Sequence, residues 1–257
     1  MLKFKIVNIF FILIFIAAVA MIWLGLLPLY VVLWVFGAWL FITFLGATNI
    51  RWNYFLNSLH TNKSIEEKAV ALTFDDGPSE NTLKILELLK KYNAKATFFC
   101  IGNKIDEHPE IFKKIIEEGH QVGNHTYSHS PITGFFGTKK METEINQCNL
   151  AAKSHAGIEM KLFRSPSGVT NPKIRKALKR TGHQSMGWSV RSFDALLRSE
   201  NIVFKLATRK LKPGMVILLH DTKPHSLAIL ERLLLFLQKR NFKTQTIGSL
   251  FKIDAYR

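Results

Sequence analysis

The chain has 257 residues, 47% of them hydrophobic, and a formal net charge of +16. This length allows one or two domains. Two cysteines, Cys100 and Cys148, are too few for a disulfide framework or a cysteine zinc site, and the sequence leaves open whether they pair. The positive charge suits an anionic partner such as membrane phosphates, but the basic residues are scattered over predicted helices without a nucleic-acid-binding motif. We therefore expect a solvated basic face and no nucleic-acid partner.

The N-terminal fifth of the chain is apolar, with no charged residue from Ile6 to Ile50. This stretch is too long for one membrane-spanning helix, since about 20 residues cross a bilayer, but it fits two. We predict a transmembrane hairpin of Ile6 to Leu24 and Leu29 to Gly46, turned at Gly25 to Pro28. Residues 1–50 are thus expected to anchor the protein in the cell membrane as a multi-pass segment.

Two other interpretations of this segment remain open. Lys3, Lys5 and the small residues Ala18 to Ala20 resemble a cleavable signal peptide, although cleavage there would leave the second span in place. A pair of soluble core helices would be expected to carry charge over such a length. Positive charge flanks both ends of the apolar stretch, and the positive-inside rule then favours a cytoplasmic position for whatever follows the hairpin.

Residues 51–67 are expected to form a linker, and residues 68–257 alternate short β-rich runs with helical periods, which indicates an α/β domain. The predicted strands are Ala69 to Phe74, Ala96 to Ile101, Gln121 to Asn124, Leu162 to Arg164, Gln184 to Trp188, Met215 to Leu219 and Lys243 to Thr246. The predicted helices are Thr82 to Tyr92, Pro109 to Glu118, Thr138 to Ala156, Pro172 to Thr181, Ile202 to Leu211 and His225 to Lys239.

Chemically useful residues follow the predicted strands. The run from Thr73 to Ser79, TFDDGPS, places Asp75 and Asp76 at the end of the first strand, and His125 and His129 follow another strand. One carboxylate and two imidazoles suit a hard-to-borderline divalent cation such as zinc. The second carboxylate is then free to act as a base. The pattern is typical of a metal hydrolase.

Four motifs in order resemble the NodB-homology polysaccharide deacetylases, also called carbohydrate esterase family 4. They are TFDDGP from Thr73, HTYSH from His125, RSPSG from Arg164 and LLHD from Leu218. The resemblance covers roughly residues 68 to 251. It implies an irregular (β/α) barrel of about seven strands, with the active site at the C-terminal ends of the strands. It also implies a metal-dependent enzyme that removes acetyl groups from N-acetylated amino sugars of a polysaccharide or lipid-linked glycan.

The resemblance also assigns roles to the first three motifs. Asp76, His125 and His129 would bind the metal. Asp75 would be the general base, held and oriented by Arg164, whose guanidinium favours the charged carboxylate.

The remaining roles concern the leaving group and the oxyanion. His220 would be the general acid, and the resemblance pairs it with an aspartate whose best match is Asp194. The backbone N–H of Ser167 would bind the oxyanion. Leu218 would wall the pocket for the acetyl methyl group.

Two departures from the family pattern affect the substrate. Many relatives have an aromatic residue where Ser167 stands, and they have Asp and Trp in the places of Arg191 and Ala195. Fewer aromatics mean less stacking surface for a sugar ring, so we expect a different glycan rather than an inactive protein. The other six histidines are expected to be structural or exposed. They are His60, His108, His120, His155, His183 and His225.

Several alternatives stay open at this stage. The bond cleaved could be an O-acetyl ester or a formamide, or the chain could be a non-catalytic glycan-binding scaffold. Zinc is the default metal, and cobalt, nickel or manganese would fit the same ligands. Many relatives act outside the cell, which opposes the cytoplasmic assignment from flanking charge. The glycan's identity and the oligomeric state are undetermined.

Overall fold

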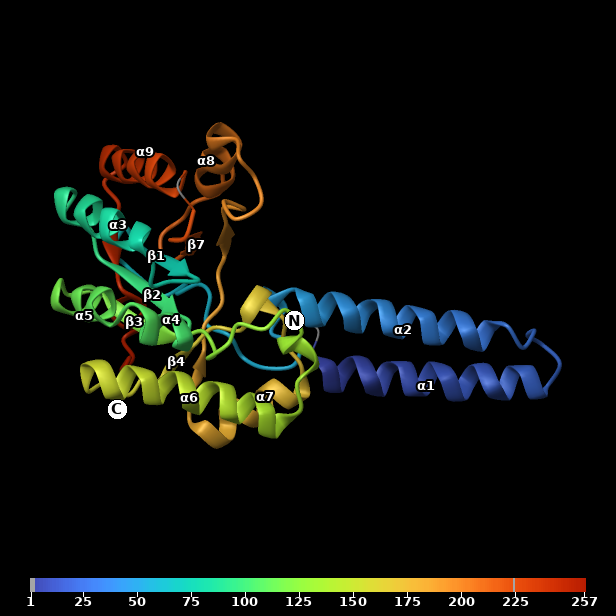
Figure 1. Ribbon diagram of the computed structural model, residues 1–257. Coiled ribbons are helices and arrows are strands. Elements are labelled where there is room, and N and C mark those ends of the chain that lie inside the picture. Colours follow the sequence, from blue (N-terminus) through green and yellow to red (C-terminus); the bar gives the residue numbers. More distant parts are fainter. Residues whose placement is uncertain (1–2, 224) are drawn as a thin grey trace.

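The computed structural model describes residues 3–223 and 225–257. It consists of an α/β body and two long helices that project side by side from one end of it (Figure 1). The helices are α1 (Phe4–Trp23) and α2 (Val31–Thr48), close to the predicted bounds. Both are long and apolar enough to cross a membrane, and only 11% and 6% of their apolar windows are buried inside the protein. They are therefore not core helices of the α/β body.

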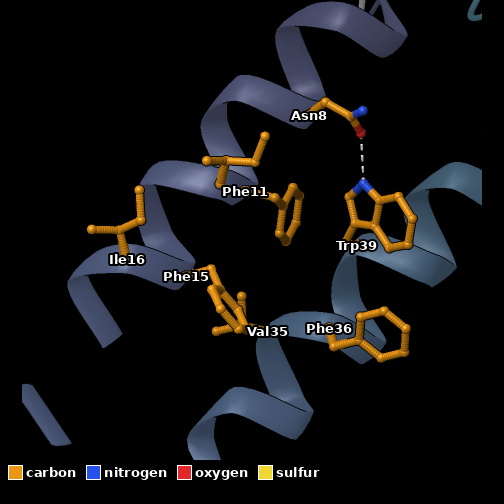
Figure 2. Close-up of a pocket in the computed structure, with 8 residues that line it drawn as sticks. Asn8, Phe11, Phe15, Ile16, Val35, Phe36 and Trp39 are labelled. Atoms are coloured by element: carbon orange, nitrogen blue, oxygen red, sulfur yellow. Dashed lines mark hydrogen bonds between the residues drawn. The ribbon is translucent and has the colours of Figure 1, made fainter. Parts of the chain in front are cut away.

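A side-chain hydrogen bond joins the two helices. Figure 2 shows Nε1 of Trp39 in α2 donating to Oδ1 of Asn8 in α1, at 2.8 Å. Within α2, the ring centroid of Phe36 lies 5.7 Å from that of Trp39. Polar pairs of this kind satisfy groups that an apolar environment would otherwise leave without partners.

Both ends of the hairpin are attached to the body. The N–H of Phe4 donates to the carbonyl of Tyr54 at 3.0 Å, and the N–H of Thr170 donates to the carbonyl of Ala47 at 2.8 Å. At Gly46 the ring of Tyr54 lies so close that a Cβ would collide with it. The hairpin and the body are thus in direct contact, without a free tether between them.

The residues expected to form a linker pack on the body. A short 3₁₀-helix (Ile50–Trp52) follows α2, and Ile50 is buried in a core cluster. Further on, Leu59 forms a parallel bridge with Met186, and Thr61 an antiparallel one with Met215.

The strands form one parallel sheet that curls into an incomplete barrel. The strands are β1 (Ala69–Asp75), β2 (Ala96–Cys100), β3 (Gln121–Asn124), β4 (Leu162–Phe163), β5 (Gln184–Ser185), β6 (Val190–Arg191), β7 (Val216–His220) and β8 (Lys243–Gln245). Their order is β5-β4-β3-β2-β1-β7-β6, with β8 also paired to β1. This confirms the predicted irregular barrel. The structure adds β6, which the sequence analysis did not predict, and it ends β5 at Ser185 rather than Trp188.

Helices pack around the outside of the sheet (Figure 1). They are α3 (Glu80–Lys91), α4 (Gly102–Glu107), α5 (Pro109–Glu117), α6 (Thr138–Ala156), α7 (Pro172–Thr181), α8 (Glu200–Thr208) and α9 (Ser226–Lys239). The short helix α10 (Ile247–Phe251) instead packs Ile247 and Leu250 into the cluster of inward-facing residues. All six predicted helices are present. The two that were missed, α4 and α10, have six and five residues, which is too short for a helical period to show in the sequence.

The side chains of the central strand β1 point alternately to the helices and to the barrel interior, and this alternation determines where Asp75 lies. All seven of its residues are buried. Val70, Leu72 and Phe74 face the helices in one core cluster, while Ala69 and Ala71 face the barrel interior in another. Because successive side chains point to opposite faces, Asp75 continues the inward row at the mouth of the barrel.

Both cysteines are free and buried in the outer core cluster. The thiol of Cys148 lies 3.5 Å from the carbonyl oxygen of Cys100.

Candidate active site

The predicted site residues meet at the C-terminal ends of the strands. They line a cavity of about 190 Å³. Its lining consists of Asp75, Asp76, His125, His129, Ser167, Trp188, Arg191, Phe193, Ala195, Leu196, Leu218 and His220. Arg164 and Asp194 lie directly behind it, each bonded to one of these residues.

Three of these residues converge as a possible metal site. Oδ1 of Asp76 lies 3.6 Å from Nε2 of His125 and 3.4 Å from Nε2 of His129. All three ligand atoms lie within 4.8 Å of one another. Tetrahedral zinc ligands at about 2.0–2.1 Å from the ion are about 3.3 Å apart, so the triad fits a cation of that size.

Backbone contacts orient the ligands. Nδ1 of His125 donates to the carbonyl of Arg164 at 2.8 Å, which leaves its Nε2 free to bind a cation. The carbonyl of Asp76 accepts from Nζ of Lys104 at 2.7 Å. The loop before His129 is held by the buried Glu144, which accepts from the N–H and the hydroxyl of Ser128. Neither Lys104 nor Glu144 was predicted from the sequence as part of the site. For Glu144, the available signal was an acidic residue on the buried face of the predicted helix α6.

The protonation states of the triad suit metal binding. Burial by itself raises the pKa of Asp76, but the hydrogen bond and charge of His125, with the charges of His220 and His129, together hold it well below its usual range. Burial lowers the pKa of His129, and the neighbouring His125 lowers it further. A charged carboxylate and a neutral imidazole are the forms that bind a cation.

Asp75 is paired with a buried arginine. Its Oδ1 accepts from Nη1 of Arg164 at 2.7 Å. The guanidinium is fully buried, lies 4.0 Å from the ring centroid of Phe99, and donates to the hydroxyl of Thr73 and the carbonyl of Gly187. The other oxygen of Asp75, Oδ2, faces the triad, 3.8 Å from Nε2 of His125. One oxygen is therefore fixed by Arg164, and the other faces the three residues of the candidate metal site.

His220 and Asp194 form a second pair. Nδ1 of His220 lies 2.9 Å from Oδ1 of Asp194, and the N–H of His220 donates to Oδ2 at 2.7 Å. Burial lowers the pKa of His220, but the hydrogen bond and charge of Asp194 outweigh it, and the pKa is raised. Ser192 and His225 also bind Asp194, through its carboxylate and its carbonyl. His225, expected from the sequence to be structural or exposed, stands just before α9 and has a structural role through this bond, whereas the sequence assigned no role to Ser192.

The loop from Pro166 to Gly168 borders the cavity. Ser167 has φ 54° and Gly168 has φ 73°. A Cβ on Gly168 would collide with the ring of Trp188, so this position requires glycine. In the part of the chain that the structure describes, the N–H of Ser167 donates to no protein group. Leu218, 2% exposed, lies in the wall of the same cavity.

Asp221, the last residue of the LLHD motif, has a structural position that the sequence analysis did not assign. It is fully buried, and its Oδ2 accepts from the hydroxyl of Thr82 at 2.6 Å. Its carbonyl accepts from Nδ2 of Asn81 at 2.8 Å. Burial raises the pKa of Asp221 to about 7. The residue ties the end of β7 to the beginning of α3.

The departures from the family pattern lie at the rim. Arg191 is exposed, and its guanidinium lies 4.8 Å from the ring centroid of Phe193 and 5.7 Å from that of Trp188. Phe193, Trp188 and Ala195 all line the cavity. Trp188 and Phe193 therefore give the cavity an aromatic surface for a sugar ring, although the aromatic residues that many relatives have at the positions of Ser167 and Ala195 are absent.

Comparisons with known proteins agree with this arrangement. Residues 62–186 match the family model described as polysaccharide deacetylase. The chain is 31% identical over 192 residues to a peptidoglycan-N-acetylglucosamine deacetylase of Bacillus cereus, covering 72% of this chain and 89% of the relative. It is 33% identical over 190 residues to the peptidoglycan-N-acetylglucosamine deacetylase PgdA of Listeria monocytogenes, covering 74% of this chain but only 40% of that longer protein.

Solved structures show the same fold. The peptidoglycan deacetylase PdaC of Bacillus subtilis superimposes with a TM-score of 0.69 at 29% identity, covering 73% of this chain and 91% of that chain. A CE4 family pseudoenzyme of Bacillus anthracis superimposes with a TM-score of 0.66 at 26% identity, covering 72% and 66%. The motifs, the barrel and the 31% identity to the Bacillus cereus deacetylase over 89% of its length together show that the chain belongs to the polysaccharide deacetylase family.

Proposed function

We propose that the protein is a metal-dependent hydrolase that removes acetyl groups from N-acetylated amino sugars of a polysaccharide or lipid-linked glycan. The observation that carries the proposal is the convergence of Asp76, His125 and His129 on one point that also faces the free oxygen of Asp75. Similar proteins are named as deacetylases of N-acetylglucosamine and N-acetylmuramic acid in peptidoglycan.

Asp76, His125 and His129 would hold the cation. Zinc is the expected metal, and cobalt, nickel or manganese accept the same ligands. A bound divalent cation would lower the pKa of a bound water and polarise the substrate carbonyl.

Asp75 is the proposed general base. Arg164 binds its Oδ1, so Oδ2 is left to take the proton of the attacking water. Two adjacent residues thus have different proposed roles: Asp76 binds the metal and Asp75 accepts the proton.

His220 is the proposed general acid. Its Nδ1 is bonded to Asp194, so its Nε2 carries the proton that passes to the leaving nitrogen. The raised pKa of His220 favours the protonated form needed for this step. The products are acetate and the free amine.

Ser167 and Leu218 complete the proposed site. The N–H of Ser167, without a protein acceptor among the described residues, is available to the developing oxyanion. Such a backbone donor contributes about 3–4 kcal/mol when it is aimed at the charge. Leu218 forms the apolar wall for the acetyl methyl group.

O-acetyl esters, formamides and a non-catalytic scaffold remain the competing functions. The scaffold alternative has a precedent in the Bacillus anthracis pseudoenzyme, which has the same fold. Retention of the triad together with Asp75 and His220 favours catalysis here.

We further propose that α1 and α2 span the cell membrane and that residues 1–50 form the anchor of a domain at residues 68–257. Both hairpin ends contact the body, so the body lies on the side where the hairpin begins and ends. Lys3, Lys5 and Arg51 flank these ends, and the positive-inside rule assigns this side to the cytoplasm.

Acetate release tests the proposed function. The full chain in detergent, reconstituted with zinc, is incubated with N-acetylglucosamine oligomers, O-acetylated xylan and an N-formylated amino sugar, with Asp75→Asn as the control. We expect acetate from the N-acetylglucosamine oligomers with wild type only. Release from the xylan alone would identify an esterase, and release of formate alone a deformylase. No product despite bound metal would favour the scaffold.

A further inference from the structure

A second cavity adjoins the catalytic one at the junction of hairpin and body. Its volume is about 530 Å³. Leu45 and Thr48 of the last turn of α2 form one wall, and the end of α8 with the turn after it forms another. Trp188, Arg191 and Phe193 line both cavities. The two spaces are therefore neighbours that share a wall.

The second cavity is strongly basic. Its lining contains Arg51, Arg191, Arg209 and Lys210 and no acidic residue. All four are exposed, and none of them forms an ion pair within residues 3–223 and 225–257. The guanidinium of Arg51 donates to the side-chain oxygen of Asn49, and that of Arg191 lies against aromatic rings. Four cations without counter-charges around one cavity suit a phosphate group, which arginine binds in a bidentate manner.

The position of this cavity relates it to the membrane. Its wall includes the C-terminal turn of an apolar helix that we propose to span the bilayer, and Trp52, in the 3₁₀-helix that follows α2, lines the same cavity. Arginine, lysine and tryptophan at the end of a membrane helix are typical of the headgroup region. A phosphate bound here would lie at the membrane surface, and the attached lipid could follow α2 into the bilayer.

We propose that the basic cavity binds the phosphate or pyrophosphate of a lipid-linked saccharide, whose acetylated sugar occupies the catalytic cavity. This inference rests on the proposed deacetylase function and specifies its substrate as a membrane lipid-linked glycan. The shared residues Trp188, Arg191 and Phe193 support it, because a sugar joined directly to a phosphate needs a sugar site and an anion site side by side. A site for bulk phospholipid would need no connection to the catalytic cavity.

Binding of an isoprenyl pyrophosphate tests the proposal without requiring catalysis. The probe is farnesyl pyrophosphate, titrated into the full chain in phosphatidylcholine nanodiscs. The pocket variant is Arg209→Gln with Lys210→Gln. The matched control is Lys239→Gln with Arg240→Gln, an adjacent exposed pair at the end of α9 that does not line the cavity. We expect the pocket variant to bind at least about tenfold more weakly and the control to bind as wild type does.

A competition experiment distinguishes a site for a lipid-linked pyrophosphate from a site for phospholipid headgroups. Excess phosphatidylglycerol in the nanodisc should not displace the probe, and displacement would mean a site for phospholipid headgroups and would overturn the proposal. Equal affinity of the pocket variant and the control would overturn it as well.

A rate measurement connects the cavity to the reaction. The ratio of kcat/KM for a pyrophosphate-linked N-acetylated sugar to that for its lipid-free form should fall about tenfold in the pocket variant and stay constant in the control. Loss of probe binding in the pocket variant, with no acetate from either substrate in wild type, would contradict the proposed deacetylase function but not the anion site. A constant ratio in the pocket variant would show that the bound phosphate does not belong to the substrate.

Discussion

At the scale of single residues, the two adjacent carboxylates Asp75 and Asp76 lie in different surroundings. Asp75 points into the barrel, where a fully buried guanidinium fixes one of its oxygens. Asp76, with φ 75°, turns out of the strand toward two imidazoles. A positive φ in a non-glycine residue is strained and is typical of functional sites. The backbone turn thus gives neighbouring residues different partners and different proposed roles.

Asp75→Asn should retain the metal and lose catalysis. The amide keeps the shape of the carboxylate and a bond to Arg164, but it no longer accepts a proton. We expect acetate release to fall by about 10²–10⁴-fold, the usual contribution of a general base, with the zinc content unchanged. Asp76→Ala should instead lose both the bound zinc and the acetate release, because it removes one of the three proposed metal ligands. Full activity of Asp75→Asn in a rate assay with parallel metal analysis would refute the base assignment.

Asp194→Asn should change the pH dependence of the reaction. The hydrogen bond and charge of Asp194 raise the pKa of His220, so their loss lowers it. A general acid is active when protonated, and activity is lost as pH rises through its pKa. The alkaline limb of the profile should therefore move to lower pH. Asp254→Asn, at an exposed carboxylate far along the chain, is the control, and an equal shift there would contradict the pairing.

At the scale of elements, the sequence predicts long regular segments better than short ones. The strands from Ala69, Ala96 and Gln121 and all six predicted helices are found nearly as expected, because hydrophobic periodicity identifies them. Strand β6 has two residues and pairs with β7 through Val190 and Arg191, so only tertiary contacts define it. The same holds for α4, which carries Lys104 to the carbonyl of Asp76.

Gly168→Ala should disrupt the loop that carries Ser167. The added Cβ would collide with the ring of Trp188, in addition to the strain of alanine at φ 73°. We expect acetate release to fall at least about tenfold and stability to fall by about 1–3 kcal/mol, while metal content is retained. Gly157→Ala, at φ 70° with open space around it, imposes only the backbone strain. If the two variants had equal rates, the geometry of the loop at Trp188 would not matter for catalysis.

At the scale of the whole molecule, the hairpin and the barrel meet beside the site. The sequence predicts the hairpin from its lack of charge and the metal triad from its motifs. It does not predict that Tyr54 and Phe55 are buried at the junction, since a linker and a packed segment look alike until tertiary contacts are known. Likewise Glu144 and His225 support the site through contacts between residues far apart in the chain.

Labelling of introduced cysteines tests the proposed membrane orientation. Cys100 and Cys148 are fully buried, so they should not react with a membrane-impermeant maleimide in the folded protein. With the body in the cytoplasm, Leu26→Cys in the turn between α1 and α2 should be labelled on intact cells. Ser199→Cys, just before α8, should be labelled only after permeabilisation. The reverse pattern would place the body outside.

The central claim is metal-dependent deacetylation at the Asp76, His125 and His129 triad. The most direct measurement is acetate release from N-acetylglucosamine oligomers by the full chain before chelation, after chelation and after zinc is restored. We predict loss of activity with the metal and recovery with about one zinc per chain, and no recovery in His129→Ala. Undiminished acetate release after complete removal of the metal would contradict the account.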